Sequence, residues 1–274
     1  MIQDIAPHIY HNEFSADKPA AEDYVLIFGK KGLLCRVTDG VICLPTVAQL
    51  GASYGESLRL FSIDNHSYCL WEQPAPEEIP GWQWQDTRGL RNLHADETLF
   101  ACAAAESLYR WYDGNRFCGR CGGSMVHGTK ERSQVCSVCG NTVYPKICPA
   151  VIVAVHDGDR LLLTRYQGRS YRRYALVAGY NEIGETIEET VHREVMEEVG
   201  LRVKNLRFYK SQPWVFTDTL LMGFYAELDG SDRLTVQEDE LSEALWLHRK
   251  DIPQDYSMIS LTGEMIEQFR LGNR

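Results

Sequence analysis

The sequence lacks any long apolar run. No uninterrupted apolar segment reaches the roughly 18 residues that a membrane-spanning helix requires. The first residues, Met1-Ile2-Gln3-Asp4, carry neither the basic nor the apolar segment of a secretory leader. We therefore expect no membrane partner and a cytoplasmic location.

An excess of positive charge is also missing. The 274 residues include 28 Lys and Arg against 38 Asp and Glu, for a net charge of −10. Proteins that rely on non-specific contacts to nucleic-acid backbone are usually basic, so free duplex DNA is not the expected main partner. A small anionic substrate is compatible with this charge, because bound cations can reverse the local field.

The cysteines do not form an even set. There are nine of them, and an odd count without a leader argues against a disulfide framework. Five are scattered along the chain, and we expect them to be small buried hydrophobic side chains. These are Cys35, Cys43, Cys69, Cys102 and Cys148.

The other four cysteines form two Cys-x-x-Cys pairs, Cys118 with Cys121 and Cys136 with Cys139, separated by 14 residues. Two such pairs complete a tetrahedron of thiolates around one zinc ion, and no position is left open for water. We therefore predict a structural zinc site. Residues 113–145 show almost no apolar periodicity, so this segment needs such a staple. A redox function is the alternative, but it needs only one pair.

Composition is otherwise ordinary, with 44% apolar and 24% charged residues, as in soluble globular proteins. The length predicts about two domains. Changes in pattern suggest a β-rich domain over 1–112, a zinc ribbon over 113–145 and a third segment over 146–274.

Short apolar runs between turn residues predict strands, and longer periodic runs predict helices. The expected strands are 24–28, 32–37, 41–43, 68–71, 151–155, 160–165, 206–209 and 220–228, and the expected helices are 94–111, 185–199 and 261–269. Strands on both sides of a helix and a final helix predict an α+β fold, with a mixed sheet sandwiched between helices.

Three glutamates stand out in the helix expected over 185–199. Glu194, Glu197 and Glu198 occupy positions i, i+3 and i+4, so they share one helix face and repel one another. A hard divalent cation would offset the repulsion, and Mg²⁺ or Mn²⁺ suits oxygen ligands best. A solvated acidic face is the alternative. The flanking Gly179 and Gly184 favour the metal, because a glycine loop lets a backbone carbonyl turn toward it.

The segment from Gly179 to Leu201 resembles the Nudix box at each defined position: Gly, five residues, Glu, seven residues, then Arg-Glu-Val-x-Glu-Glu-x-Gly-Leu. The resemblance implies that 146–274 is a Nudix hydrolase domain with an α/β/α sandwich. This family hydrolyses nucleoside diphosphates linked to another moiety. By resemblance Glu194, Glu198 and the Ala178 carbonyl bind the metal, and Glu197 is a further ligand or orients the attacking water. The positions with a structural role would be Gly179, Glu185, Arg193 and Gly200.

A second motif follows the box. Residues 211–219, Ser-Gln-Pro-Trp-Val-Phe-Thr-Asp-Thr, resemble the Ser-Gln-Pro-Trp-Pro-Phe-Pro-x-Ser signature of the NAD(H) diphosphatase branch. The order of β-rich domain, four-cysteine ribbon and Nudix domain is similar too. Val215 and Thr217 replace two prolines and Thr219 replaces the final Ser. Loss of the prolines frees the loop, which allows a substrate range broader than NAD(H).

The resemblance extends to single positions, for each of which surface or core packing is the alternative. Tyr144 matches an aromatic residue that stacks on substrate across a dimer interface, and Tyr180 matches a second stacking position. Glu240 matches a late metal or substrate glutamate. The remaining expected substrate positions are Ser211, Gln212, Pro213, Trp214, Thr219, Glu131, Arg88 and Thr262.

The resulting expectation is a homodimeric hydrolase that converts NADH or NAD⁺ to NMN(H) and AMP, with catalytic Mg²⁺ or Mn²⁺ and one structural Zn²⁺ per chain. Removal of an NAD cap from an RNA 5′ end is a related activity of the same branch. One alternative is a Nudix hydrolase of ADP-ribose or dinucleoside polyphosphates. Another, of a different class, is a zinc-ribbon RNA-binding or scaffold protein with an inactive Nudix fold.

Overall fold

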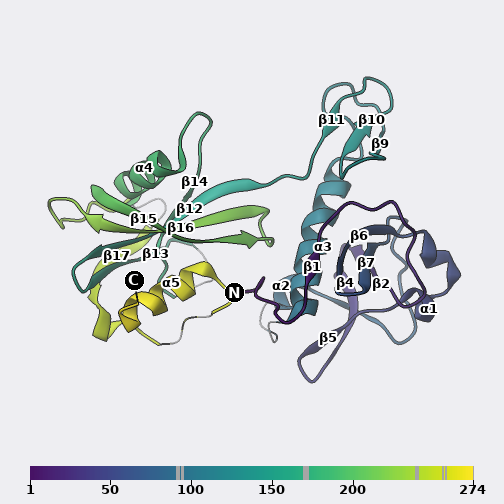
Figure 1. Ribbon diagram of the computed structural model, residues 1–274, viewed down its shortest axis with the longest axis horizontal. Helices are drawn as coiled ribbons and strands as arrows, with labels where there is room; N and C mark the ends of the chain where they lie inside the picture. Colours follow the sequence, from purple (N-terminus) through teal and green to yellow (C-terminus); the bar gives the residue numbers. More distant parts are fainter. Residues whose placement is uncertain are drawn as a thin grey trace. The chain divides into compact units, whose positions relative to one another are not determined.

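The computed structural model describes residues 1–90, 93, 96–168, 173–237, 241–254, 256 and 258–273, and only the backbone of Ala52 and Arg88 (Figure 1). Contacts divide the chain into two units. One comprises Met1, 147–214 and 218–274, and the other comprises 2–146 and 215–217. No helix in the described part of the chain is long and apolar enough to cross a membrane.

The N-terminal unit begins with two small sheets. The first has the order β1 (Tyr10–His11), β6 (Leu58–Ile63), β7 (His66–Leu70) and β2 (Tyr24–Leu26). The second contains β3 (Phe28–Gly29), β4 (Gly32–Thr38) and β5 (Val41–Cys43), with β8 (Gln83–Gln85) paired to β4. Three short helical segments complete this region: α1 (Val47–Leu50), η1 (Ala52–Glu56) and α2 (Thr87–Leu90). The predicted β-rich character of this region is confirmed.

A long helix, α3 (Glu97–Gly114), follows. The Asp96 side chain accepts a hydrogen bond from the Leu99 N–H at 2.8 Å, which caps the helix. Its alanine-rich first half is buried from Leu99 to Ala105. The predicted helix is confirmed, although its first expected residues, 94 and 95, lie outside the described residues. The domain boundary expected after residue 112 falls inside this helix.

The ribbon consists of three short strands, β9 (Met125–His127), β10 (Gln134–Cys136) and β11 (Thr142–Val143), with β10 in the centre. Of the five scattered cysteines, Cys35, Cys69 and Cys102 are buried as predicted. The prediction is wrong for Cys43, which is exposed because it lies on the outward face of β5.

The C-terminal unit is built on one mixed sheet of order β15-β16-β12-β13-β17, with β14 paired to β12. These strands are β12 (Cys148–Asp157), β13 (Arg160–Tyr166), β14 (Val177–Tyr180), β15 (Val203–Trp214), β16 (Thr219–Leu228) and β17 (Leu241–His248). The β12 strand is parallel to β16 and antiparallel to β13 and β14. A short 3₁₀ segment, η2 (Arg249–Asp251), follows β17.

Helices α4 (Ile187–Val199) and α5 (Leu261–Leu271) cover opposite faces of this sheet (Figure 1). The reason lies in the alternation of side chains along β12. Val151, Val153 and Val155 pack with the valines of α4, whereas Ile152 and Ala154 pack with α5. The predicted sandwich is therefore confirmed, and each helix buries one apolar stripe against the sheet.

Candidate active site and structural metal centre

Helix α4 is delimited by local signals at both ends. The Thr186 hydroxyl accepts from the Glu189 N–H at 3.2 Å, and the Glu189 carboxylate accepts from the Thr186 N–H at 2.7 Å. This reciprocal pair is a capping box. At the other end Gly200 adopts the left-handed conformation with φ of 71°, where a side chain would be strained.

Gly179 in β14 lies directly beneath the carboxylate of Glu194. A Cβ atom added to Gly179 would lie 1.9 Å from Cδ of Glu194 and 2.1 Å from each carboxylate oxygen. Such distances are far inside van der Waals contact. The absence of a side chain at position 179 therefore allows the Glu194 carboxylate to rest on the backbone of β14, next to Ala178.

The three box glutamates differ in burial. Glu194 is 9% exposed and Glu198 is 1% exposed, whereas Glu197 is exposed. Within the described ranges, only the four ribbon cysteines bring three or more metal-ligand atoms within 4.8 Å of one another. The expected ligand Glu240 lies outside the described residues. The glutamates thus share a helix face without converging on one point.

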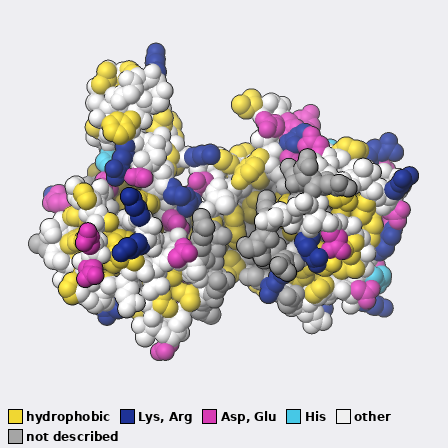
Figure 2. All heavy atoms as spheres, turned by 180° about the vertical axis from the view of Figure 1, so that it is seen from behind, with side chains coloured by type: hydrophobic (Ala, Val, Ile, Leu, Met, Phe, Trp, Pro, Cys, Tyr) yellow, Lys and Arg dark blue, Asp and Glu magenta, His cyan; other side chains and the backbone are white. Residues whose placement is uncertain are grey.

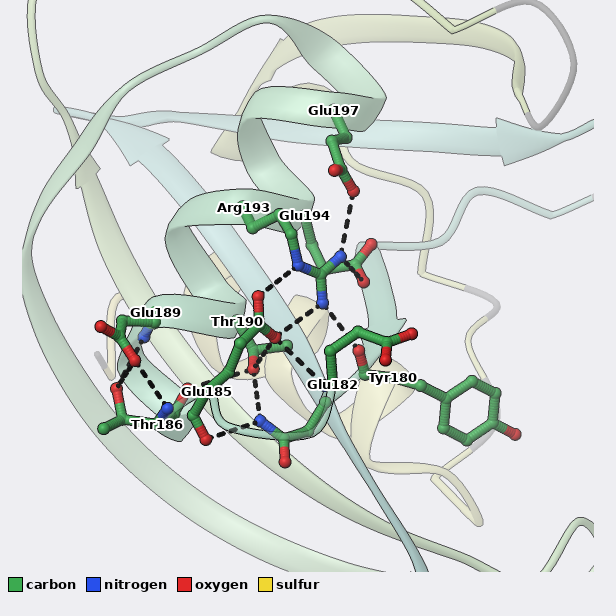
Figure 3. A network of polar contacts seen from close by, with 10 residues as sticks. Tyr180, Glu182, Glu185, Thr186, Glu189, Thr190, Arg193, Glu194 and Glu197 are labelled. Carbon is green, nitrogen blue, oxygen red and sulfur yellow. Dashed lines mark hydrogen bonds and ion pairs between the residues drawn. The ribbon is translucent and has the colours of Figure 1, made fainter.

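Arg193 links the box together (Figure 3). Its Nε and Nη2 donate to the two carboxylate oxygens of Glu185 at 2.5 and 2.9 Å. Nη1 donates to Glu194 at 2.7 Å and to Glu197 at 3.0 Å, and Nη2 also donates to the Tyr180 carbonyl at 2.9 Å. The guanidinium therefore holds two of the candidate metal ligands near each other, against their mutual repulsion.

The hydrogen bonds between Arg193 and Glu185 shift both groups toward their charged forms. They lower the pKa of Glu185 to about 2 and raise the pKa of Arg193. Glu185 also accepts from the Glu182 N–H at 3.1 Å and from the Thr190 hydroxyl at 3.0 Å. The loop that leads into α4 is therefore closed by charge-assisted bonds, with fully buried Thr190 at its centre.

Two residues missed by sequence reasoning, Asn181 and Thr190, support this loop. The Asn181 amide donates to the Thr190 hydroxyl at 2.7 Å and to the Glu185 carbonyl at 3.3 Å. An Asn two residues after the first box glycine is a turn-former. That signal could have pointed to Asn181, whereas nothing local distinguishes Thr190 from a packing residue.

Three expected substrate positions meet in the C-terminal unit. Tyr180 is 53% exposed, and its hydroxyl lies 3.2 Å from the Thr219 hydroxyl. Trp214 pairs with Thr219 across β15 and β16. Along β14, Val177 packs with the α4 cluster and Ala178 with the α5 cluster, so the Tyr180 ring lies with Thr219 on the α5 side of the strand, whereas Gly179 faces the Glu194 carboxylate on the α4 side.

Gln212 was expected to contact substrate, but its side chain is fully buried. Its Nε2 donates to the Ile259 carbonyl at 2.9 Å, and its Oε1 accepts from the Leu261 N–H at 2.7 Å. Gln212 therefore ties the start of α5, where the expected residue Thr262 lies, to β15. Its neighbours Ser211 and Pro213 are exposed, as the alternation of a strand requires.

The two expected positions in and near the ribbon contact each other. The Tyr144 hydroxyl donates to Glu131 at 2.9 Å, and both residues are exposed. This acceptor raises the pKa of Tyr144. Arg88 lies in α2, and its side chain is not described.

The four cysteines form a compact cluster in the N-terminal unit. The Sγ atoms of Cys118 and Cys139 are 3.7 Å apart, and those of Cys121 and Cys136 are 3.5 Å apart. Thiolates about 2.3 Å from a tetrahedral zinc ion lie about 3.8 Å from one another. The cluster therefore has the dimensions of a zinc site.

The two cysteine loops have matching conformations. Gly122 donates to the Cys118 carbonyl at 2.9 Å, and Gly140 donates to the Cys136 carbonyl at 3.0 Å. Both glycines have positive φ, 74° and 70°. Backbone N–H groups of Cys139 and Val138 point at the Cys136 sulfur and lower its pKa to about 6. The pKa of Cys118 is lowered in the same way, chiefly by the Arg120 N–H, so the repeated loop favours the thiolate of the first cysteine in each pair.

Comparisons with known proteins agree with this organisation. Residues 146–269 match the NUDIX domain, and residues 113–144 match the NADH pyrophosphatase zinc ribbon domain. A Stutzerimonas stutzeri (strain A1501) protein named NAD-capped RNA hydrolase NudC is 35% identical over 237 residues, 84% of this chain and 81% of the relative. A relative of the same name from Pseudomonas syringae pv. tomato (strain ATCC BAA-871 / DC3000) is 37% identical over 82% of this chain and 78% of its own. A NUDIX hydrolase structure from Nitrosomonas europaea, 22% identical, covers 57% of this chain and 90% of its own with a TM-score of 0.49.

Proposed function

Because the chain belongs to the Nudix hydrolase family, in the branch with an NADH pyrophosphatase zinc ribbon, we propose that it hydrolyses the diphosphate bond of NADH and NAD⁺ to give NMN(H) and AMP. The relatives named NAD-capped RNA hydrolase support a second substrate, NAD at the 5′ end of an RNA. The observation that carries the proposal is the Glu194 carboxylate seated on Gly179, on the same helix as buried Glu198.

A divalent cation fits these residues. Glu194 and Glu198 are two nearly buried carboxylates one helical turn apart, where a cation in addition to Arg193 would be favourable, and all the candidate donors are hard oxygen atoms, which suit Mg²⁺ or Mn²⁺. The proposed ligands are the Ala178 carbonyl, Glu194, Glu197 and Glu198, together with Glu240. A bound ion would neutralise the diphosphate and lower the pKa of an attacking water.

The residues of the chain supply positioning, which is most of what phosphoryl and nucleotidyl transfer requires. Arg193 holds Glu194 and Glu197, and it is itself fixed by two bonds to Glu185. The Tyr180 ring, which points away from these glutamates (Figure 3), provides a flat exposed surface for stacking on nicotinamide or adenine. The Thr219 hydroxyl contacts the Tyr180 hydroxyl and orients that ring.

We also propose that Tyr144 completes the site from the second subunit of a homodimer, and that the ribbon cysteines hold one structural zinc. A mixing experiment tests the shared site. Two inactive variants, Tyr144→Ala and Glu198→Gln, are combined under conditions that exchange subunits. Recovery of activity in the mixture supports contribution across the interface, and its absence in verified mixed dimers refutes it.

The altered loop favours one alternative, hydrolysis of ADP-ribose or a dinucleoside polyphosphate. Val215 and Thr217 lack the rigidity of proline. However, the Val215 carbonyl accepts from Arg110 at 3.0 Å, so this loop is held by a tertiary contact instead. A purely RNA-binding or scaffold role is less well supported, because charged side chains of both signs are interspersed over the face seen in Figure 2.

The decisive test is a nucleotide panel with Mg²⁺ or Mn²⁺, read by mass. Release of NMN from NAD⁺ supports the proposal, whereas cleavage of ADP-ribose alone overturns it. Glu198→Gln should abolish hydrolysis, and Glu188→Gln, an exposed glutamate on the same helix, should leave it unchanged. If Glu198→Gln retains full activity, the catalytic assignment is wrong.

The proposed location is the cytoplasm. All nine cysteines are free of disulfide bonds, as expected in a reducing compartment.

A further inference from the structure

Thr190, a fully buried residue near the start of α4, has a hydroxyl with three polar neighbours. Its Oγ1 lies 2.7 Å from Nδ2 of Asn181, 3.0 Å from Oε2 of Glu185 and 3.1 Å from the Thr186 carbonyl oxygen. The same Asn181 nitrogen lies 3.3 Å from the Glu185 carbonyl, so the amide oxygen would meet an acceptor if it were turned around. Since an amide nitrogen only donates, the Thr190 hydroxyl accepts from Asn181.

The Thr190 hydroxyl has one proton of its own to donate. The Thr186 carbonyl already accepts from the Thr190 backbone N–H at 3.1 Å, and an ionised carboxylate is the stronger acceptor. The proton therefore points at Oε2 of Glu185. Because Thr190 is fully buried, water cannot take the place of either partner. Asn181 thus sets the direction of the hydrogen bond from Thr190 to Glu185.

Glu185 passes this constraint to Arg193 (Figure 3). One edge of the guanidinium, Nε and Nη2, donates to the Glu185 carboxylate at 2.5 and 2.9 Å. The remaining nitrogen, Nη1, donates to Glu194 at 2.7 Å and to Glu197 at 3.0 Å. A guanidinium is planar and rigid, so the carboxylate that holds one edge also fixes the direction of Nη1.

The other end of this series of bonds is anchored in the sheet. Asn181 directly follows β14, and its backbone N–H donates to the carbonyl of Pro149 in β12 at 3.1 Å. From there the bonds run through the Asn181 and Thr190 side chains to Glu185 and Arg193, and no link exceeds 3.1 Å. The central strand is therefore connected to two of the candidate metal ligands.

We propose that Asn181 and Thr190 are positioning residues for the divalent cation of the candidate active site. They act through Glu185 and Arg193, and not by contact with the ion. Together they hold the Glu194 and Glu197 carboxylates in place before an ion arrives. The inference rests on the proposed metal site at α4 and adds the means by which this chain prepares that site.

The test measures Mn²⁺ binding to the full-length, zinc-loaded protein without nucleotide, by electron paramagnetic resonance of the free ion. Thr190→Val removes the hydroxyl at nearly constant shape, and Asn181→Leu removes the amide with little change of size. Each should raise the Kd for Mn²⁺ about 10-fold, the low end of the effect of residues that orient metal ligands. Thr190→Ser keeps the hydroxyl and should restore most of the affinity.

Thr164→Val is the matched control. Thr164 is a second fully buried threonine of the same unit, and its hydroxyl donates to the Ala175 carbonyl at 3.4 Å. Its replacement also removes a buried hydrogen bond, but it should leave the Mn²⁺ affinity unchanged. The comparison therefore separates positioning of the metal ligands from a general loss of stability.

Glu198→Gln, at a proposed ligand, gives the background binding of this acidic protein. If the wild type binds Mn²⁺ no better than Glu198→Gln, the proposed metal site itself is wrong. If the wild type binds more tightly but Thr190→Val and Asn181→Leu equal it, only the positioning role is wrong.

Two further results would overturn the proposal. One is a loss of affinity in Thr190→Ser or Thr164→Val as large as that in Thr190→Val. The other is a double variant, Asn181→Leu with Thr190→Val, in which the two losses multiply, because residues in one series of bonds should not act independently. Should Thr190→Val fail to fold, the partly buried Asn181→Leu position decides the matter.

Discussion

Gly179→Ala is the sharpest perturbation that the structure offers. The new Cβ would lie 1.9 Å from Cδ of Glu194, whereas ordinary carbon contacts are about 3.5–4.0 Å. The Gly179 backbone is in a conformation open to any residue, so the effect is purely steric. Overpacking of this kind costs about 1–3 kcal/mol, or else the Glu194 carboxylate moves away from β14.

Both outcomes can be measured. We expect a lower midpoint of thermal unfolding and a loss of NAD⁺ hydrolysis of about 100-fold, since misplacing a catalytic group by about 1 Å has that effect. Gly114→Ala is the control, because an added Cβ at that position meets nothing within 4 Å.

A double-mutant cycle tests the steric explanation directly. Glu194→Ala removes the atoms that the new Cβ would strike, so Gly179→Ala should cost almost nothing in that background. The expected coupling energy is about 1–3 kcal/mol. An equal loss of stability with and without the Glu194 carboxylate would refute the reasoning.

The remaining predictions concern other parts of the fold. Because Arg193 lowers the pKa of Glu185 to about 2, below the ordinary carboxyl pKa of about 4.3, their bond stabilises the protein above that pH, and the contribution is lost as pH falls toward 2. The stability difference between wild type and Glu185→Gln should therefore shrink from pH 6 to pH 2, and a constant difference would contradict this. Gln212→Leu removes two buried hydrogen bonds and should cost about 1–3 kcal/mol, with faster amide exchange at Leu261 than in an exposed Ser211→Ala control. Removal of zinc with a chelator should release one zinc ion per chain and unfold the ribbon, and Cys136→Ser should have the same effect. Cys43→Ser, at an exposed cysteine outside the cluster, should retain zinc. A ribbon that stays folded without metal would show that zinc has no structural role.

The helices show why some features were predictable. The box helix carries its start and stop in adjacent residues, Thr186 with Glu189 and then Gly200, and its valines recur at helical spacing. The expected range, 185–199, agrees with the structure because these signals are local. The strands β14 and β17 were not predicted, and β14 in particular, Val177–Tyr180, is only four residues long and contains Gly179.

The same distinction holds for the candidate sites. The cluster of the four cysteines was predicted from their spacing alone, because two Cys-x-x-Cys loops together supply the four thiolates that a tetrahedral zinc ion needs. Gln212 was predicted from a motif as a substrate position, but its amide binds the backbone at the start of α5. Ile259, whose carbonyl accepts from the Gln212 amide, is 47 residues away in the sequence. No local sequence pattern could have predicted this contact.

The sequence by itself determined the chemistry: the carboxylates of α4, the arginine among them, and the thiolates of the ribbon all follow from residue types at fixed short spacings. Tertiary structure alone decided where that chemistry is held. It places the Glu194 carboxylate against Gly179, and it buries Gln212 against the start of α5. The physical reason is that spacing along a helix or loop sets only local geometry, whereas contacts between distant segments depend on how sheets and helices pack.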